Sequence, residues 1–324
     1  MRDTARAFWV TAPGRGEIQD VTVASPREDE ILVRTRFSGV SRGTEALVFA
    51  GRVPRSEWTR MRAPFQEGVF PAPVKYGYMN VGVVEIGPPR LRGRLVFVLF
   101  PHQTHYVVPA SSAHPVPEDL PARRAVLAAN METAVNGLWD ARPHVGDRIV
   151  VVGAGAVGCL VAWLASRVAG CPVQLVDVND SRAEVARSLG VAFATPSTAE
   201  GDADLVVHAS GTVEGLALAL RLAALEATVV EMSWFGNRTV PLPLGESFHV
   251  NRLTIRSSQV GRIPPAQRAR WDTTRRMRFA LDLLRDERLD VLLTGESGFE
   301  SLPDTMRRLT SGADHPLCHV VAYD

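Results

Sequence analysis

A glycine-rich stretch near the middle of the chain has the residue types and spacing of a phosphate-binding turn. It reads Gly153-Ala154-Gly155-Ala156-Val157-Gly158, follows a β-branched run and opens a helical pattern. In this setting Gly153 allows a tight turn, Gly155 lets the backbone approach a pyrophosphate, and Gly158 lets the helix pack closely against the strand. The phosphates would lie at the positive amino end of the helix. The stretch therefore predicts a dinucleotide site.

An acidic residue, Asp177, follows at the end of the next predicted strand, about twenty residues on, as such a site requires. Its carboxylate suits the ribose hydroxyls of the adenosine half and would repel a 2′-phosphate, so we predict NAD(H) rather than NADP(H). Arg182 has two interpretations: it binds that phosphate, or it lies one turn into the next helix and pairs with solvent or an acid. Ser210 is predicted to contact the same cofactor. A doubly wound fold without a cofactor is the alternative.

Strands and helices alternate around these residues. The expected elements are helices at 122–140, 156–168, 181–188 and 213–222 and strands at 148–152, 173–177, 205–209, 228–232 and 253–257. Such alternation with short connections predicts a parallel sheet with helices on both faces.

The first third of the chain is rich in β-branched residues instead, and helical periodicity is nearly absent there. Strands are expected at 5–10, 18–23, 31–37, 81–86, 94–99 and 105–108, with a looped insert at 50–73, tail helices at 265–285 and 302–310, and a last strand at 318–322. The last strand should return to the first domain. We therefore predict an α/β chain with a β-rich domain of residues 1–122 and 266–324 and a doubly wound domain of residues 123–265. Aromatic residues of the insert, Trp58 and Phe65, cover a substrate or form a satellite core.

A second candidate stretch, residues 39–45, reads Gly-Val-Ser-Arg-Gly-Thr-Glu. With the β-rich first half, the glycine-rich turn and the returning tail, it makes the whole chain resemble the medium-chain dehydrogenase/reductase superfamily. The resemblance implies a GroES-like catalytic domain followed by a Rossmann domain. It also implies a homodimer and hydride transfer between a nicotinamide and a small alcohol or carbonyl substrate in the cleft between the domains. Gly43-Thr44-Glu45 and the later Gly77-Tyr78 are similar to the bacteriochlorophyllide hydroxyethyl dehydrogenase branch.

The superfamily's zinc ligands have no counterparts in this chain. By the resemblance, the three catalytic ligand positions are Ser41, Tyr78 and Ala129, and the loop of close cysteines that holds a structural zinc is absent. A catalytic zinc needs three protein donors and a structural zinc needs four. We therefore predict an enzyme without a metal.

The resemblance assigns Arg42 to the pyrophosphate, Thr133 to the nicotinamide and Thr44 to the hydroxyl that relays the substrate proton. Without zinc, a proton donor must stand near the substrate oxygen, and Tyr78 is the candidate. A phenol has a pKa near 10, which suits donation during carbonyl reduction, whereas alcohol oxidation would require a lowered pKa. His102 is expected to exchange the proton with solvent. A packing role for Tyr78 is the alternative.

Two acids near these positions, Glu45 and Glu132, are expected to be structural, Glu45 by pairing with an arginine or by capping the next turn. Two other functions stay open. A quinone or enoyl reductase of the same superfamily commonly uses NADPH, which Asp177 disfavours. The other is a non-catalytic NAD(H)-binding redox sensor.

Composition limits the partners. The 324 residues carry a formal net charge of +1 and 22% charged residues, so no overall field draws the protein to nucleic acid or to a membrane. Lys75 is the only lysine, so a cluster of arginines at 52, 55, 60 and 62 indicates a solvated surface rather than a phosphate clamp. The three cysteines include no CxxC pair, which favours reduced, buried thiols and a cytoplasmic location. The start shows no signal-peptide pattern, and the uncharged stretch 149–165 is interpreted as strand, turn and helix rather than a membrane span.

Overall fold

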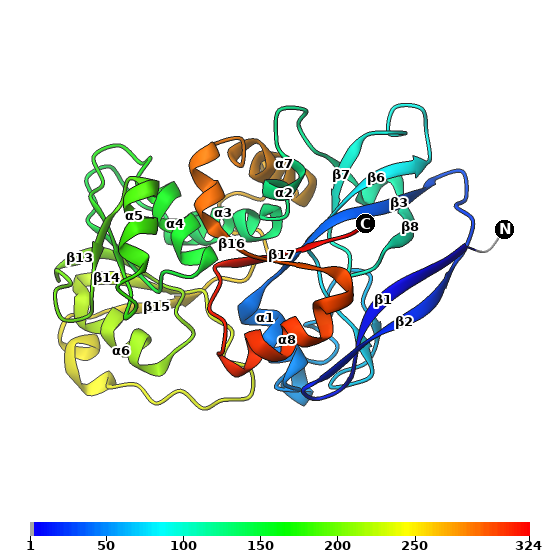
Figure 1. The fold of residues 1–324 in the computed structure, drawn as a ribbon. Coiled ribbons are helices and arrows are strands. Elements are labelled where there is room, and N and C mark those ends of the chain that lie inside the picture. Colours follow the sequence, from blue (N-terminus) through cyan, green and yellow to red (C-terminus); the bar gives the residue numbers. More distant parts are fainter. Residues whose placement is uncertain (1–2) are drawn as a thin grey trace. The chain divides into compact units, whose positions relative to one another are not determined.

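A computed structural model describes residues 3–324; Met1 and Arg2, with which the first predicted domain begins, lie outside the described residues. The chain divides into two compact units. Unit 1 comprises the described residues up to Ala129 together with Met277–Asp324, and unit 2 comprises Asn130–Arg276. Unit 1 therefore joins the first and last parts of the chain, drawn blue to cyan and orange to red in Figure 1.

Unit 1 is built on two sheets. A four-stranded sheet has the order β2-β1-β5-β4, and a seven-stranded sheet has the order β16-β17-β3-β6-β7-β9, with β8 paired to β3. The strands are β1 (Asp3–Ala12), β2 (Arg15–Val23), β3 (Glu30–Val40), β4 (Glu67–Gly68), β5 (Val74–Lys75), β6 (Asn80–Ile86), β7 (Leu95–Val98), β8 (His105–Pro109), β9 (His114–Pro115), β16 (Leu293–Gly298) and β17 (Cys318–Ala322). The six strands expected in the first third are thus present as β1, β2, β3, β6, β7 and β8.

The predicted return of the last strand is confirmed. β17 pairs antiparallel with β3, with His319 opposite Val40 and Ala322 opposite Phe37, and Figure 1 shows the red strand beside the blue one. The first four residues of β17 are buried. This apolar strand is stabilised in the interior of the sheet, where its backbone groups are hydrogen-bonded on both sides.

Helices depart from the expectations in three places. α1 (Arg42–Phe49) lies in a region where the sequence shows almost no helical periodicity. Its eight residues bury only Glu45, Val48 and Phe49, too few apolar positions to mark a helix in the sequence. The helix expected at 122–140 is two helices, α2 (Ala122–Ala125) and α3 (Ala128–Ala141). The helix expected at 265–285 begins only at Thr273, as α7 (Thr273–Leu283), where the Asp272 carboxylate caps it by accepting a hydrogen bond from the Arg275 backbone N–H.

Short helical segments and one longer helix complete unit 1. They are η1 (Arg55–Glu57), η2 (Ala110–Ser112), η4 (Glu287–Leu292), η5 (Phe299–Ser301) and α8 (Leu302–Ser311). Strands β4, β5, β9 and β16 were not expected from the sequence. Each of the first three has two residues, and β16 carries glycines and polar residues, so none has the apolar alternation that marks a strand.

Unit 2 is a doubly wound sheet of six parallel strands, in the order β12-β11-β10-β13-β14-β15. The strands are β10 (Ile149–Val152), β11 (Val173–Val176), β12 (Ala192–Ala194), β13 (Ala203–His208), β14 (Ala223–Glu231) and β15 (Thr254–Ser257). The helices are α4 (Ala156–Ala165), α5 (Arg182–Leu189), α6 (Val213–Leu222) and the short η3 (Leu244–Phe248), together with α3 from Asn130 onward. The chain runs outward from β10 to β12 and then crosses to β13 on the other side of β10. The carboxyl ends of β10 and β13 therefore form a topological switch point, where such sheets bind ligands.

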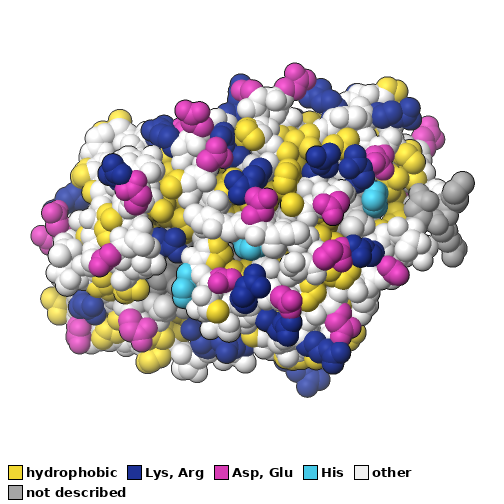
Figure 2. Space-filling model, viewed as in Figure 1, with side chains coloured by type: hydrophobic (Ala, Val, Ile, Leu, Met, Phe, Trp, Pro, Cys, Tyr) yellow, Lys and Arg dark blue, Asp and Glu magenta, His cyan; other side chains and the backbone are white. Residues whose placement is uncertain are grey.

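The α/β fold class is confirmed, since the two units are a β-rich body and a parallel doubly wound sheet. The uncharged stretch near residue 150 forms β10 and α4, a four-residue strand and a ten-residue helix. Across residues 3–324, no helix has the length and apolarity needed to cross a membrane. Figure 2 shows acidic and basic side chains interspersed over the visible face, as the small net charge implies.

Candidate functional site

The glycine-rich turn joins β10 to α4 and has the geometry that its three glycines predict. Gly153 has a φ of 108°, a conformation that favours glycine. A Cβ on Gly158 would lie 1.8 Å from the Gly153 carbonyl oxygen, so the helix and the turn are in direct backbone contact. A Cβ on Gly155 would have nothing within 4 Å. The turn is therefore packed tightly behind and open at Gly155, where a phosphate would approach the helix amino end.

Asp177 follows the last residue of β11 and lies against this turn. One carboxylate oxygen, Oδ2, accepts a hydrogen bond from the Ala154 backbone N–H at 2.6 Å, and Oδ1 accepts one from the Asn179 N–H at 2.9 Å. The carboxylate is thus held in place, and each oxygen keeps a lone pair for a further donor. Arg182 is the first residue of α5, so the interpretation that placed it one turn into the helix is wrong.

Ser210 is brought to the same turn. It comes two residues after the end of β13, the strand next to β10, and a Cβ on Gly153 would lie 2.5 Å from its backbone nitrogen. Its hydroxyl lies 2.6 Å from Nε2 of His208, whose Nδ1 lies 2.6 Å from Oε2 of Glu231. His208 and Glu231 are not among the residues predicted from the sequence. The pattern that could have identified them is a polar residue at the carboxyl end of a buried parallel strand.

A second polar network lies in unit 1 around His102. Its Nε2 is 2.8 Å from Oε2 of Glu45, and its Nδ1 is 2.7 Å from the Ser38 hydroxyl. The Ser38 hydroxyl lies 2.9 Å from the hydroxyl of Tyr323, near the end of the chain. His102 is only 1% exposed. The expectation that His102 exchanges a proton with solvent is therefore wrong, because both ring nitrogens are engaged and buried.

Glu45 links this network to the start of α1. Its Oε1 accepts a hydrogen bond from the Ser41 backbone N–H at 2.8 Å, which caps the helix. Its other oxygen pairs with His102 and not with an arginine. Both carboxylate oxygens of this buried acid are thus occupied, and its charge acts on the residues around it.

Tyr78 is half-buried beside the same helix start. Its side chain is hydrogen-bonded to the side chains of Ser41 and Thr44. Burial first, and then the charge of Glu45, raise the pKa of Tyr78 to about 12, while the bonds with Ser41 and Thr44 act in the opposite direction. The hydroxyl therefore meets other hydroxyls, and it is protonated throughout the physiological range.

The two remaining residues that were predicted to bind the cofactor, Arg42 and Thr133, lie in different helices. Arg42 begins α1, and its Nη1 lies 3.4 Å from Nδ1 of His315. Thr133 lies in α3, in unit 2. The neighbouring Glu132 is buried and forms a 3.0 Å ion pair with Arg276, so it has a structural role. Burial raises the pKa of Glu132, and the Arg276 charge opposes this.

The thiols are free, as predicted. Cys159, Cys171 and Cys318 are all buried, and burial raises the pKa of Cys159 and Cys318 to about 12. Low reactivity follows, since the thiolate is the reactive form. Within the described part of the chain, no three His, Cys, Asp or Glu side chains come together as a metal site would require.

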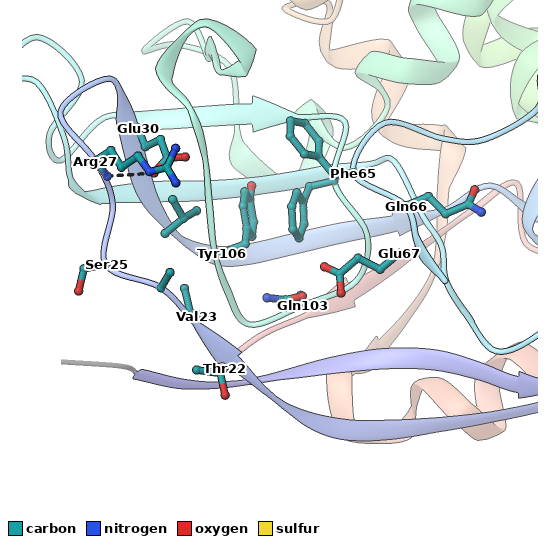
Figure 3. A pocket seen from close by; sticks show the side chains of 13 residues that line it. Thr22, Val23, Ser25, Arg27, Glu30, Phe65, Gln66, Glu67, Gln103 and Tyr106 are labelled. Carbon is teal, nitrogen blue, oxygen red and sulfur yellow. Dashed lines mark hydrogen bonds between the residues drawn. The ribbon is translucent and has the colours of Figure 1, made fainter. Parts of the chain in front are cut away.

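A cavity of about 460 Å³ opens in unit 1 between β2, β8 and the end of the insert. In Figure 3 the side chains of Glu67 and Gln103 point toward one another. The ring of Tyr106 stacks on that of Phe100, with their centroids 3.8 Å apart. The Phe65 ring lies 5.5 Å from that of Phe100 and packs on the core, as a satellite core would. None of Tyr78, Thr44 and His102 lines this cavity. The candidate catalytic residues therefore lie in the hydrogen-bond networks outside it.

Comparisons with known proteins agree with this architecture. The model of the family "Ketopantoate reductase PanE/ApbA" matches residues 149–213, the segment of the glycine-rich turn. D-guloside 3-dehydrogenase from Escherichia coli (strain K12) is 26% identical over 293 residues, which are 82% of this chain and 84% of that protein.

Two solved structures cover nearly the whole chain. One is a putative zinc-binding dehydrogenase from Sinorhizobium meliloti 1021 bound to NADP, with a TM-score of 0.78, 17% identity and 99% of each chain covered. The other is a short chain alcohol dehydrogenase from E. coli CFT073 complexed with NADH, with a TM-score of 0.75, 17% identity, and 98% of this chain and 99% of that chain covered. These structures show the fold, a GroES-like domain joined to a Rossmann domain. With the relative's name, they support the medium-chain dehydrogenase superfamily and an oxidoreductase.

Proposed function

We propose that this protein is an NAD(H)-dependent oxidoreductase that interconverts an alcohol and a carbonyl compound without zinc. The observation that carries the proposal is the Tyr78 hydroxyl, hydrogen-bonded to Ser41 and Thr44 with a pKa raised to about 12. Two of these three residues stand at positions that the superfamily resemblance assigns to zinc ligands. In the proposed mechanism the hydroxyl groups of Tyr78, Ser41 and Thr44 therefore take the role that a zinc ion would have in proton transfer.

The raised pKa of Tyr78 determines which protonation form of the phenol is available to the reaction. When bound, the nicotinamide supplies or accepts the hydride. Tyr78 holds the proton that a carbonyl oxygen needs as it becomes an alkoxide, and the Ser41 and Thr44 hydroxyls stabilise the phenolate left behind. A phenol with a pKa of about 12 holds its proton at neutral pH, so the phenolate that alcohol oxidation would use as a base is scarce. The protonation state of Tyr78 at neutral pH therefore suits proton donation in carbonyl reduction.

The preference for NAD(H) rests on Asp177. The neighbouring structures hold either NADP or NADH, so nicotinamide binding is supported, and the choice between the two is our proposal. The carboxylate of Asp177 lies 2.6 Å from the turn's Ala154 N–H. A 2′-phosphate at the same position would face this negative charge.

We predict that Asp177→Ala weakens NADH binding by about one to two decades, because charge-assisted hydrogen bonds are each worth roughly 1.5–3 kcal/mol and about 1.4 kcal/mol is a factor of ten. Asp180→Ala is the control, since Asp180 is an exposed aspartate three residues on. Calorimetry with NADH and NADPH measures both affinities. Equal or tighter NADPH binding by the unmodified protein would contradict the assignment.

The function itself is tested by turnover. Loss of NADH absorbance is followed with a panel of aldehydes, ketoses, quinones and enones. Reduction of an aldehyde or ketose supports the proposal, whereas activity confined to quinones or enones indicates the related reductases. Tight NADH binding with no turnover on any compound would favour a redox sensor. A homodimer and a cytoplasmic location stay predictions.

A further inference from the structure

A polar array at the carboxyl ends of β13 and β14 has no part in the chemistry described above. His208 is the last residue of β13 and Glu231 is the last residue of β14, and the two are paired in the parallel register. The two strands lie side by side in the green part of Figure 1. A buried imidazole, a carboxylate and the Ser210 hydroxyl are thus connected through two contacts of 2.6 Å.

The proton positions in the array follow from the donor inventory. An ionised Glu231 only accepts hydrogen bonds, so Nδ1 of His208 donates to it and Nε2 is left to accept from the Ser210 hydroxyl. The oxygen of Ser210 in turn accepts from the Thr212 backbone N–H at 3.2 Å. The direction of the Ser210 hydroxyl is therefore set by three partners, counting the Thr212 hydroxyl at 2.9 Å.

The same carboxylate ties two loops together. Oε1 of Glu231 accepts from the Ser233 backbone N–H at 2.6 Å, and the Ser233 hydroxyl accepts from the Gly211 N–H at 3.0 Å. Arg238 donates to the Gly211 carbonyl oxygen at 2.7 Å. The loops that follow β13 and β14 are therefore hydrogen-bonded to one another through Ser233, Gly211 and Arg238.

The array lies on one side of the glycine-rich turn, and Asp177 lies on the other. β10 is between β11, which Asp177 follows, and β13, which Ser210 follows. A dinucleotide whose pyrophosphate lies on the α4 amino end and whose adenosine half reaches Asp177 must extend its other half over β13 and β14.

The array resembles a hydrolase triad only in its residue types. In a triad, the imidazole takes a proton from the serine and passes it to the leaving group, which it must reach. His208 is 0% exposed, so no leaving group can approach it. The imidazole can hold the serine but cannot complete acyl transfer.

We propose that His208 and Glu231 are positioning residues that hold Ser210 and its loop as the subsite for the nicotinamide-riboside half of the dinucleotide. The inference rests on the proposed function, since it requires that unit 2 binds a dinucleotide. The ligand class is a ribosyl group with hydroxyls that meet the Ser210 loop. The adenosine half is recognised independently, by the turn and Asp177.

The test separates the two halves of the cofactor. Binding of NADH and of ADP, which lacks the nicotinamide riboside, is measured by calorimetry on the full chain for Ser210→Ala, His208→Gln and Glu231→Gln. In Glu231 one oxygen accepts from His208 and the other from Ser233. Glutamine replaces one of these oxygens with an NH2 donor, so it cannot accept from both partners where they stand. We expect NADH affinity to fall about 3- to 30-fold in each variant, with ADP affinity within about twofold of the unmodified protein, and Ser210→Thr to restore NADH binding.

Glu226→Gln is the matched control, because Glu226 lies on the same strand and its side chain pairs with the exposed Arg252 at 2.8 Å. It should change neither affinity. If NADH and ADP weaken by the same factor, or if NADH binding is unchanged, the positioning role is wrong. Should His208→Gln fail to fold, the two other substitutions decide the result. An unmodified protein that binds ADP but no NADH would instead refute the proposed function.

Discussion

At the scale of single residues, the candidate chemistry depends on the carboxylate of Glu45, which makes hydrogen bonds to two partners. Glu45 caps α1 through Ser41 and pairs with the buried His102, at 2.8 Å in both contacts. Burial first, and this carboxylate second, raise the pKa of Tyr78. One acid therefore organises the helix start and adds to the burial that keeps the proposed donor protonated.

Replacing the proposed donor tests this directly. Tyr78→Phe removes only the hydroxyl, so we expect kcat for carbonyl reduction to fall by at least about 10²-fold, since a positioned acid contributes roughly 10²–10⁴ in rate. NADH affinity should stay within a few-fold. Thr44→Val should lower kcat less, because solvent can replace part of a relay. Tyr76→Phe is the control, as Tyr76 lies next to Tyr78 with its ring 6.0 Å away; an equal loss in Tyr76→Phe would show that the effect is not specific.

The raised pKa of Tyr78 also predicts a pH dependence of stability. Below pH 10 the folded and unfolded states both hold the proton, and the stabilising contribution is fully present. Between pH 10 and 12 the unfolded state loses the proton first, so the free energy of unfolding falls as the pH rises. By pH 11 the unmodified protein should lose about 1 kcal/mol relative to Tyr78→Phe. Urea unfolding of both proteins at pH 9 and pH 11 measures this. If the free energy of unfolding changes by the same amount in both proteins, the pKa of Tyr78 is not raised.

At the scale of elements, the turn between β10 and α4 contains one glycine that is needed for packing and another that leaves space for the proposed cofactor. Gly158 is in backbone contact with Gly153, whereas Gly155 faces open space. Two alanine substitutions three residues apart should therefore fail for different reasons.

We expect Gly158→Ala to lower the free energy of unfolding by about 1–3 kcal/mol, because a Cβ would force the helix away from the turn. Gly155→Ala should leave stability nearly unchanged, since the residue has a φ of −77° and free space. It should still weaken NADH binding by at least about tenfold, because the methyl group stands where the pyrophosphate approaches. Thermal unfolding and NADH titration measure the two effects. Gly155→Ala with unchanged NADH affinity would place the phosphates elsewhere.

At the scale of the whole molecule, the ionisable residues are distributed over two units with separate tasks. Unit 2 carries the turn, Asp177 and Ser210, while unit 1 carries Tyr78 and its hydroxyl partners. Ser41 and Tyr78, which the resemblance places at zinc-ligand positions, belong to unit 1 and are hydrogen-bonded to each other. The protein should therefore work without a metal.

We predict that the purified protein contains no stoichiometric zinc, because a hydroxyl, a phenol and the methyl side chain of Ala129 do not provide three zinc donors. Elemental analysis after dialysis, together with activity after treatment with a chelator, measures this. About one zinc per chain, or activity lost to the chelator and regained with zinc, would contradict the prediction.

The sequence by itself determined those features that depend on neighbours along the chain. The glycine spacing, the following helix and Asp177 lie within one strand–turn–helix–strand segment, so their arrangement follows from local geometry. Buried strands such as β10 and β17 were predictable because their apolar runs have few other ways to be buried. The helix at 122–140 was divided, and α1 was missed, because packing decided what propensity left open.

Tertiary structure alone decided which polar groups meet. His102 and Glu45 are 57 positions apart, and His208 and Glu231 are 23 apart. Neither pair has a spacing that a helix or strand would bring together, so each depends on strand order and register. Burial then requires that a polar group find a partner, because an unpaired one costs about 1–3 kcal/mol. The direction of the Tyr78 pKa shift and the buried state of His102 follow from that packing, which no local pattern in the sequence contains.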